Sequence, residues 1–266
     1  MRLASFDIGK KNFAHYVELL SEKDIKILDD LREEYSRLPK KQQRRVKGPM
    51  NDKIASILHR VCMTGTRVQT GVYDLREDKE STTLDMETRR NILMHLDNYR
   101  ELWSNCDRII VEQQFFRTSV YKGKGTEANV DAIKIGELVL GWFLNEFPYK
   151  EISYFGSQNK TLILGAPYNL DKSGRKRWAI VKSEEIYRGR NDEDMIEIFE
   201  LKVRIFRKRL NTHEKCEEFL SSCKAVSEDC IELAKRMIYD RQKLDDVFDC
   251  LVQLQAYKFR AMVAMF

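Results

Sequence analysis

Short apolar runs at the start of the chain predict two neighbouring β-strands. Residues 3–8 (Leu-Ala-Ser-Phe-Asp-Ile) form the first run, and a turn segment begins at Gly9. Residues 13–20 form a second run, so we expect the two segments to pair as a hairpin. Residues 66–75, 108–112 and 151–155 have the same short length and strand-favouring composition. They are therefore predicted to be three further strands.

Longer stretches between these predicted strands have the periodicity of helices. Apolar residues recur at helical spacing over 81–105, 129–147 and 242–262, and a short helix after Gly156 is predicted to carry Lys160. Strands that alternate with helices in this order predict an α/β protein with a mixed central sheet flanked by helices.

Two highly charged and mainly helical segments, 21–64 and 165–239, interrupt this pattern. The chain has 266 residues and a net charge of +5. The first segment has 11 basic and 7 acidic residues, and the second has 16 and 14, so the positive surplus lies in these insertions. The other 147 residues amount to about one ordinary domain. We therefore predict a single domain over 1–266 that carries two insertions.

Composition excludes several classes of protein. Hydrophobic residues make up 42% of the chain and aromatics 10%, with only four prolines, which argues against disorder. No run of 18 apolar residues and no signal peptide is present, so no membrane contact is expected. The six cysteines form no Cys-x-x-Cys pair, and reduced thiols fit an intracellular protein. Cys216, Cys223 and Cys230 recur every seven residues, up to Met237, and predict an apolar helical face.

Two acidic residues lie at notable places in the predicted strands. Asp7 is an acid within an apolar strand, where burial is costly unless the carboxylate is paired or binds a cation. Glu112 ends the run that begins at Arg108, and strand ends are where ligand sites form in α/β sheets. Taken singly, Asp7 can cap a turn and Glu112 can pair with a lysine.

Three further acids lie at the start of the last predicted helix. Asp246 and Asp249 are three residues apart, and Asp245 and Asp249 are four apart, so spacing makes both pairs helical neighbours. The cluster can simply favour a helix N-terminus. Together with two strand carboxylates, it can instead hold a pair of Mg²⁺ or Mn²⁺ ions, which prefer oxygen ligands and promote phosphodiester hydrolysis.

Five segments together resemble the Holliday junction resolvases, the RuvC-like branch of the RNase H fold. They are residues 5–9 (Ser-Phe-Asp-Ile-Gly), 111–115 (Val-Glu-Gln-Gln-Phe), 129–136, 156–160 and 246–251. Within that family the chain looks closest to the resolvases of poxviruses and other large DNA viruses. Both insertions are longer than those of compact members, and the segment before Lys160 departs from the family pattern because it has no proline.

The resemblance implies an RNase H-like sheet and a metal-dependent endodeoxyribonuclease. Such an enzyme resolves four-way (Holliday) DNA junctions by paired phosphodiester hydrolysis in recombination and repair, with two Mg²⁺ or Mn²⁺ ions per active site. Lys160 would stabilise charge on the scissile phosphate or position the attacking water. The alignment favours Asp246 over Asp245. The catalytic residues that it implies are Asp7, Glu112, Lys160, Asp246 and Asp249, of which the four acids are the metal ligands.

Two basic segments are predicted to contact DNA. Residues 115–125 combine three basic residues with three aromatics and no acid, and aromatics beside such a site can stack on unpaired bases or wedge a junction open. Residues 172–182 hold five basic residues and no acid, which would neutralise phosphates. The Gly-Lys-Gly-Thr sequence at 123–126 lacks the spacing of a Walker loop, so no nucleotide cofactor is expected. The predicted DNA contacts are Phe115, Phe116, Arg117, Tyr121, Lys122, Lys124, Arg175, Lys176 and Arg177.

Symmetric cutting of two strands requires two active sites, so a homodimer on branched DNA is predicted. The seam would be either the 216–237 stripe or the helix over 129–147.

Three other functions compete with resolution: an RNase H-fold nuclease for flaps or RNA–DNA hybrids, an actin-like ATPase, and a non-catalytic DNA-binding relative. The ATPase would need a second phosphate loop, which the sequence lacks. A poxvirus-like chain would act in viral factories of the host cytoplasm, and otherwise in a nucleus or cytosol.

Overall fold

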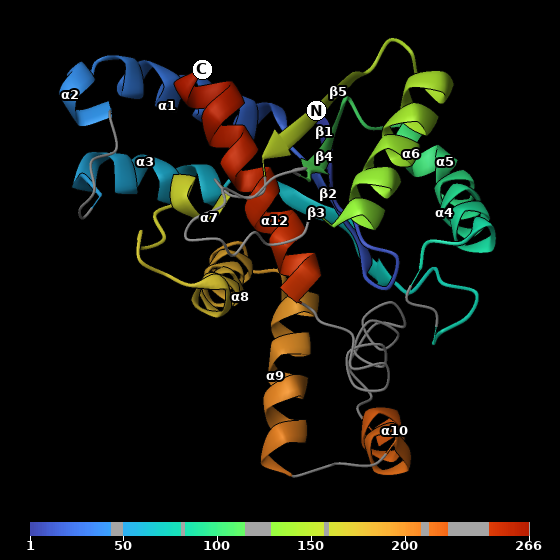
Figure 1. The fold of residues 1–266 in the computed structure, drawn as a ribbon. Helices are drawn as coiled ribbons and strands as arrows, with labels where there is room; N and C mark the ends of the chain where they lie inside the picture. The colour runs from blue at the N-terminus through green and yellow to red at the C-terminus, as the bar shows by residue number, and fades with distance from the viewer. Residues whose placement is uncertain are drawn as a thin grey trace, which may run out of the picture.

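A five-stranded mixed sheet forms the centre of the molecule (Figure 1). The computed structural model describes residues 1–43, 50–80, 83–114, 129–156, 160–208, 213–222 and 245–265. The strand order is β3-β2-β1-β4-β5, in which β1, β2 and β3 pair antiparallel and β1, β4 and β5 pair parallel. The strands are β1 (Arg2–Asp7), β2 (Phe13–Leu19), β3 (Thr66–Tyr73), β4 (Arg108–Gln113) and β5 (Glu151–Gly156). All five predicted strands are confirmed.

Helices cover both faces of this sheet, because alternate residues of each strand point to opposite sides. Phe6 and Val111 pack into one buried cluster beneath α4 (Met86–Asn98), α5 (Arg100–Ser104) and α6 (Val130–Glu146). Leu3 and Ile110 pack into the other cluster, beneath α12 (Asp245–Tyr257). This arrangement confirms the predicted α/β fold class, a mixed central sheet flanked by helices.

Most described residues of the two predicted insertions lie in helices. These are α1 (Glu22–Ser36), α2 (Lys40–Gln43) and α3 (Asp52–Cys62) in the first, and α8 (Lys172–Gly189), α9 (Glu193–Arg207) and α10 (His213–Ser222) in the second. α8 packs along α12 and α1 packs against the C-terminal segment, whereas α9 extends away from the sheet (Figure 1). Ser21 and Asp24 form a capping box at the start of α1, and Asp171 caps α8. The short helix α7 (Lys160–Ile163) lies between β5 and α8.

The continuous helix predicted over 81–105 is wrong. The structure has two helices, because the chain leaves helical geometry at Tyr99, which has φ −105° and ψ 16°. The Tyr99 ring packs against His15 and His95, and its hydroxyl lies 2.9 Å from the hydroxyl of Tyr73. These contacts with β2 and β3 come from distant parts of the sequence, so local periodicity does not reveal the break.

The last helix also differs from its prediction. Regular α-helix ends at Tyr257, and the chain continues as a π-helix, η1 (Lys258–Ala264). Lys258 is fully buried where the geometry changes, and its ammonium group donates hydrogen bonds to Glu18 and Thr64. Among the described helices, none has the length and apolar composition of a transmembrane span. The predicted 216–237 stripe lies mostly outside the described residues.

Candidate active site

Two neighbouring parallel strands bring Asp7 and Glu112 together. Phe6 lies opposite Val111 in the register of β1 and β4, so the two acids follow directly at the carboxyl ends of these strands. A side-chain hydrogen bond links the two carboxyl groups. This is the strand-end position at which α/β sheets form ligand sites.

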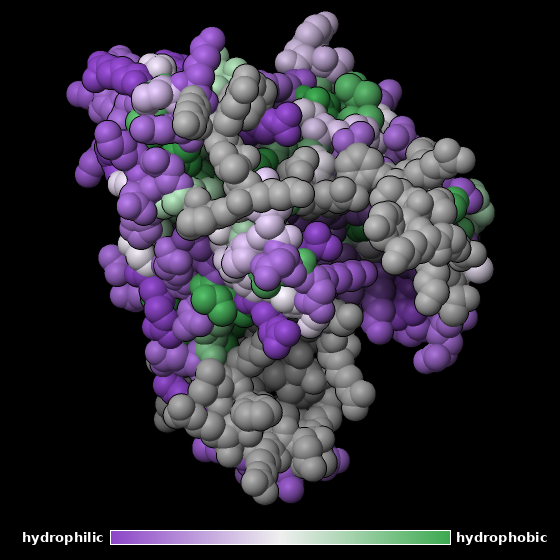
Figure 2. Space-filling view, turned by 60° about the vertical axis from the view of Figure 1, so that its left-hand side comes forward, coloured by the Kyte–Doolittle hydropathy of each residue, from purple (hydrophilic) through white to green (hydrophobic). Residues whose placement is uncertain are grey.

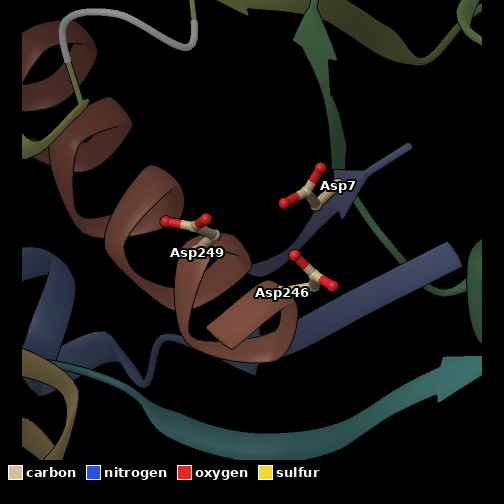
Figure 3. A group of neighbouring side chains, drawn as sticks. All are labelled: Asp7, Asp246 and Asp249. Atoms are coloured by element: carbon tan, nitrogen blue, oxygen red, sulfur yellow. The ribbon is translucent and has the colours of Figure 1, made fainter. Parts of the chain in front are cut away.

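Helix α12 places two more acids beside Asp7. Asp246 and Asp249 lie one turn apart on the helix, which is anchored in the core by the buried side chains of Val247 and Phe248. One carboxylate oxygen from each of Asp7, Asp246 and Asp249 lies within 4.8 Å of the others. Figure 3 shows the three carboxylates converging from the end of β1 and the first turns of α12. The pair of acids three residues apart therefore belongs to this group.

A buried amide sets the position of α12 against β1. The side-chain amide of Gln253 donates to Ser5 Oγ at 3.0 Å and to the carbonyl oxygen of Phe6 at 3.2 Å. These bonds form directly before Asp7 in the chain, and Gln253 lies one turn after Asp249. Gln253 therefore aligns the helix acids with the strand acid, a role that the sequence reading missed. The available signal was a glutamine one turn after Asp249, on the helix face that carries the acids.

Lys160 lies among the acids. It begins α7, its side chain is 8% exposed, and its Nζ donates to Glu112 Oε1 at 2.9 Å and lies 3.4 Å from Asp249 Oδ1. The other carboxylate oxygen of Glu112 accepts a hydrogen bond from Gln114 at 2.7 Å. Lys160 thus joins the strand acid Glu112 to the helix acid Asp249.

The electrostatics of the site show an excess of negative charge. Burial, and then repulsion from Glu112, raises the pKa of Asp7 well above its usual range. Burial also raises the pKa of Asp249. Burial would raise the pKa of Glu112 too, but attraction to Lys160 and hydrogen bonds from its neighbours lower it instead. The charged forms of Asp7 and Asp249 are therefore disfavoured in the folded protein, whereas that of Glu112 is favoured by its pairing with Lys160.

The donor set fits a hard divalent cation. The three clustered acids offer oxygen ligands, which Mg²⁺ and Mn²⁺ prefer, and a bound cation would relieve the repulsion that raises the pKa of Asp7. Asp7, Asp246 and Asp249 are the residues that could hold it. Glu112 borders this group through its hydrogen bond with Asp7.

The predicted DNA contacts are divided between two regions. Phe115, Phe116, Arg117, Tyr121, Lys122 and Lys124 lie outside the described residues. Arg175, Lys176 and Arg177 lie in the first two turns of α8. The structure brings Lys176 to the acids, since its Nζ lies 3.9 Å from Asp246 Oδ1, whereas Arg177 is exposed.

Sequence comparison finds relatives among viral proteins. No protein-family model matches the chain. Uncharacterized protein 97L of Invertebrate iridescent virus 3 is 26% identical over 196 residues, covering 71% of this chain and 87% of its own length. Uncharacterized protein 170L of Invertebrate iridescent virus 6 is also 26% identical, over 278 residues that cover 97% of this chain and 88% of that protein.

Structural comparison finds resolvases. Thermus thermophilus RuvC matches with a TM-score of 0.46 and 10% identity, covering 100% of this chain and 98% of its own. Fowlpox virus resolvase in complex with substrate Holliday junction DNA matches with a TM-score of 0.40 and 12% identity, covering 97% of each chain.

Proposed function

We propose that this chain is a metal-dependent endonuclease that resolves four-way DNA junctions by paired phosphodiester hydrolysis. The observation that carries the proposal is the convergence of four acids and one lysine at the ends of β1 and β4 and the start of α12. Asp7, Asp246 and Asp249 form the carboxylate group, and Lys160 joins Glu112 to Asp249. The sequence motifs that carry these residues resemble those of the Holliday junction resolvases.

The carboxylates would hold the metal, and the lysine would organise them. Asp7, Asp246 and Asp249 would bind one Mg²⁺ or Mn²⁺ ion, and Glu112 with Asp7 would bind a second. When bound, such ions make a water molecule a better nucleophile and stabilise the leaving oxygen. Lys160 fixes Glu112 in place through its hydrogen bond and lies between it and Asp249.

Two further parts of the proposal concern DNA and the partner subunit. Lys176 of α8 lies beside the acids, and hydrophilic residues predominate among the coloured residues on the face shown in Figure 2. Such a surface suits contacts with DNA phosphates. Paired cutting requires a homodimer, for which α6 is a candidate seam because Val130 and Leu144 are about half exposed on it. The viral relatives favour a role in the recombination and repair of viral DNA in the host cell.

Cleavage of a panel of synthetic substrates tests the proposal. We expect Mg²⁺-dependent nicks at symmetric positions of a four-way junction, and little cutting of a linear duplex, a flap or an RNA–DNA hybrid. Asp249→Asn should reduce cutting by at least a hundredfold while leaving junction binding within a few-fold of wild type. Equal cutting of all four substrates would contradict junction selectivity, and cutting of the hybrid alone would favour the ribonuclease alternative.

A further inference from the structure

Lys176 lies on the face of α8 that packs against α12. The buried residues of α8 are Ala179, Ser183, Ile186 and Tyr187, which recur at helical spacing. Lys176 is three residues before Ala179 and therefore extends the same stripe toward the start of α12. Its side chain is 33% exposed, while the next residue, Arg177, is exposed. The helix thus directs Lys176 toward the active site and Arg177 toward solvent.

Lys176 and Lys160 approach the acids from different elements and in different ways. Lys160 is buried in α7, with a 2.9 Å hydrogen bond to Glu112 and Asp249 at 3.4 Å. Lys176 comes from the second insertion and lies 3.9 Å from Asp246, a distance of electrostatic contact rather than of a hydrogen bond. The acids therefore lie between an enclosed lysine and a lysine on their more open side.

We infer that Lys176 binds a non-bridging oxygen of the phosphodiester group that is to be cleaved. The inference rests on the proposed nuclease function, because a scissile phosphate must lie against the carboxylates that hold the metal. An ammonium group within 4 Å of Asp246 is in reach of such a phosphate, and it is a compact charge with three donors. Lys160, enclosed by Glu112 and Asp249, organises the acids instead. The second insertion thereby adds a substrate-binding residue to the active site.

The competing role for Lys176 is to offset the charge of Asp246. In that role the lysine would matter for stability and for metal affinity, but the cutting rate at saturating metal would not depend on it. Binding of the scissile phosphate predicts the reverse, because the contact stabilises charge on the phosphate during reaction. The two roles therefore separate in single-turnover kinetics.

The experiment compares Lys176→Ala, Lys176→Arg and the matched control Arg177→Ala with wild type. Single-turnover cleavage is measured at saturating enzyme and Mg²⁺, and junction affinity is measured without divalent cations. We expect Lys176→Ala to lower the cleavage rate about 10- to 100-fold and to weaken junction binding less than about threefold. Lys176→Arg should recover most of the rate. Arg177→Ala should weaken junction binding and should lower the saturated cleavage rate less than Lys176→Ala does.

Two results would overturn the inference. The first is a wild-type cleavage rate in Lys176→Ala at saturating Mg²⁺, with or without a change in the Mg²⁺ requirement. The second is a slow Lys176→Ala variant with a lowered melting temperature that Lys176→Arg does not restore, since this marks a structural role. The substrate that the wild type cuts tests the proposed function separately. The cleavage rate of Lys176→Ala relative to wild type on that substrate tests the role of Lys176.

Discussion

The carboxyl group of Asp7 is buried beside other acids, which disfavours its charged form. Burial raises its pKa, and so does repulsion from Glu112 and from Asp249 and Asp246 on the neighbouring helix. A raised pKa means that the folded protein binds this proton more tightly than the unfolded chain does. The contribution of Asp7 to stability is therefore present at low pH and is lost as pH rises through its folded pKa.

Asp7→Asn is expected to stabilise the metal-free protein. Asparagine resembles the protonated acid and can donate to Glu112, so the variant should melt at a higher temperature than wild type at pH 7.5. The difference should shrink toward pH 5, where wild-type Asp7 retains more of its proton. Thermal melts in EDTA at both pH values measure this, and a lower melting temperature for the variant at pH 7.5 would contradict it.

Metal addition provides the complementary measurement at the same residue. Mg²⁺ should raise the melting temperature of wild type more at pH 7.5 than at pH 5, because the cation competes with the proton. It should raise that of Asp7→Asn much less, since one of the three clustered carboxylates is gone. An equal rise in both proteins would show that Asp7 is not a ligand.

At the scale of elements, the site depends on how α12 lies against β1. Gln253 makes the two hydrogen bonds that connect them beside Asp7. Gln253→Leu should destabilise the protein by about 1–3 kcal/mol, because Ser5 and the Phe6 carbonyl lose a buried partner. It should also lower the cleavage rate, because the helix acids would shift relative to Asp7.

A double-mutant cycle with Ser5→Ala isolates this contact. Ser5→Ala removes only one of the two hydrogen bonds, so it should cost less than Gln253→Leu in urea denaturation. The two costs should be non-additive, because the residues share an interaction. Strict additivity would show that the bond does not couple the helix to the strand.

Local patterns predict individual elements well, but they do not predict contacts between distant segments. The five strands and the positions of Asp7 and Glu112 follow from short apolar runs and the acids at their ends. The break at Tyr99 does not follow, because it depends on rings from β2 and β3. Gln253 likewise has its partner 248 residues away in Ser5. Lys176 was predicted to contact DNA, but its approach to Asp246 required the packing of α8 on α12.

At the scale of the whole molecule, a buried ion cluster joins the end of α8 to the central sheet. Glu18 of β2 accepts from Lys258 Nζ at 2.6 Å and from Arg190 at 2.7 Å. Arg190 follows the end of α8, and Lys258 begins η1. Burial lowers the pKa of Lys258 to about 8, although Glu18 opposes the change. The cluster therefore ties the helix that carries Lys176 to the sheet that carries Asp7.

Lys258→Met is expected to destabilise the protein by about 3–5 kcal/mol, because it breaks a buried charge cluster by removing one partner. Urea denaturation measures the loss, and Lys26→Met, on an exposed residue of α1, is the matched control. The control should lie within about 0.5 kcal/mol of wild type. A similar small effect for Lys258→Met would show that Arg190 alone suffices to pair Glu18.

The most direct test of junction resolution uses a supercoiled plasmid that extrudes a cruciform. Two coordinated cuts across the junction release linear DNA, whereas a single nick relaxes the plasmid, lets the cruciform reabsorb and leaves a nicked circle. We predict Mg²⁺-dependent linear product from wild type as the major species, and none from Asp249→Asn. Nicked circles alone, or equal cutting of a plasmid without the cruciform, would contradict the account.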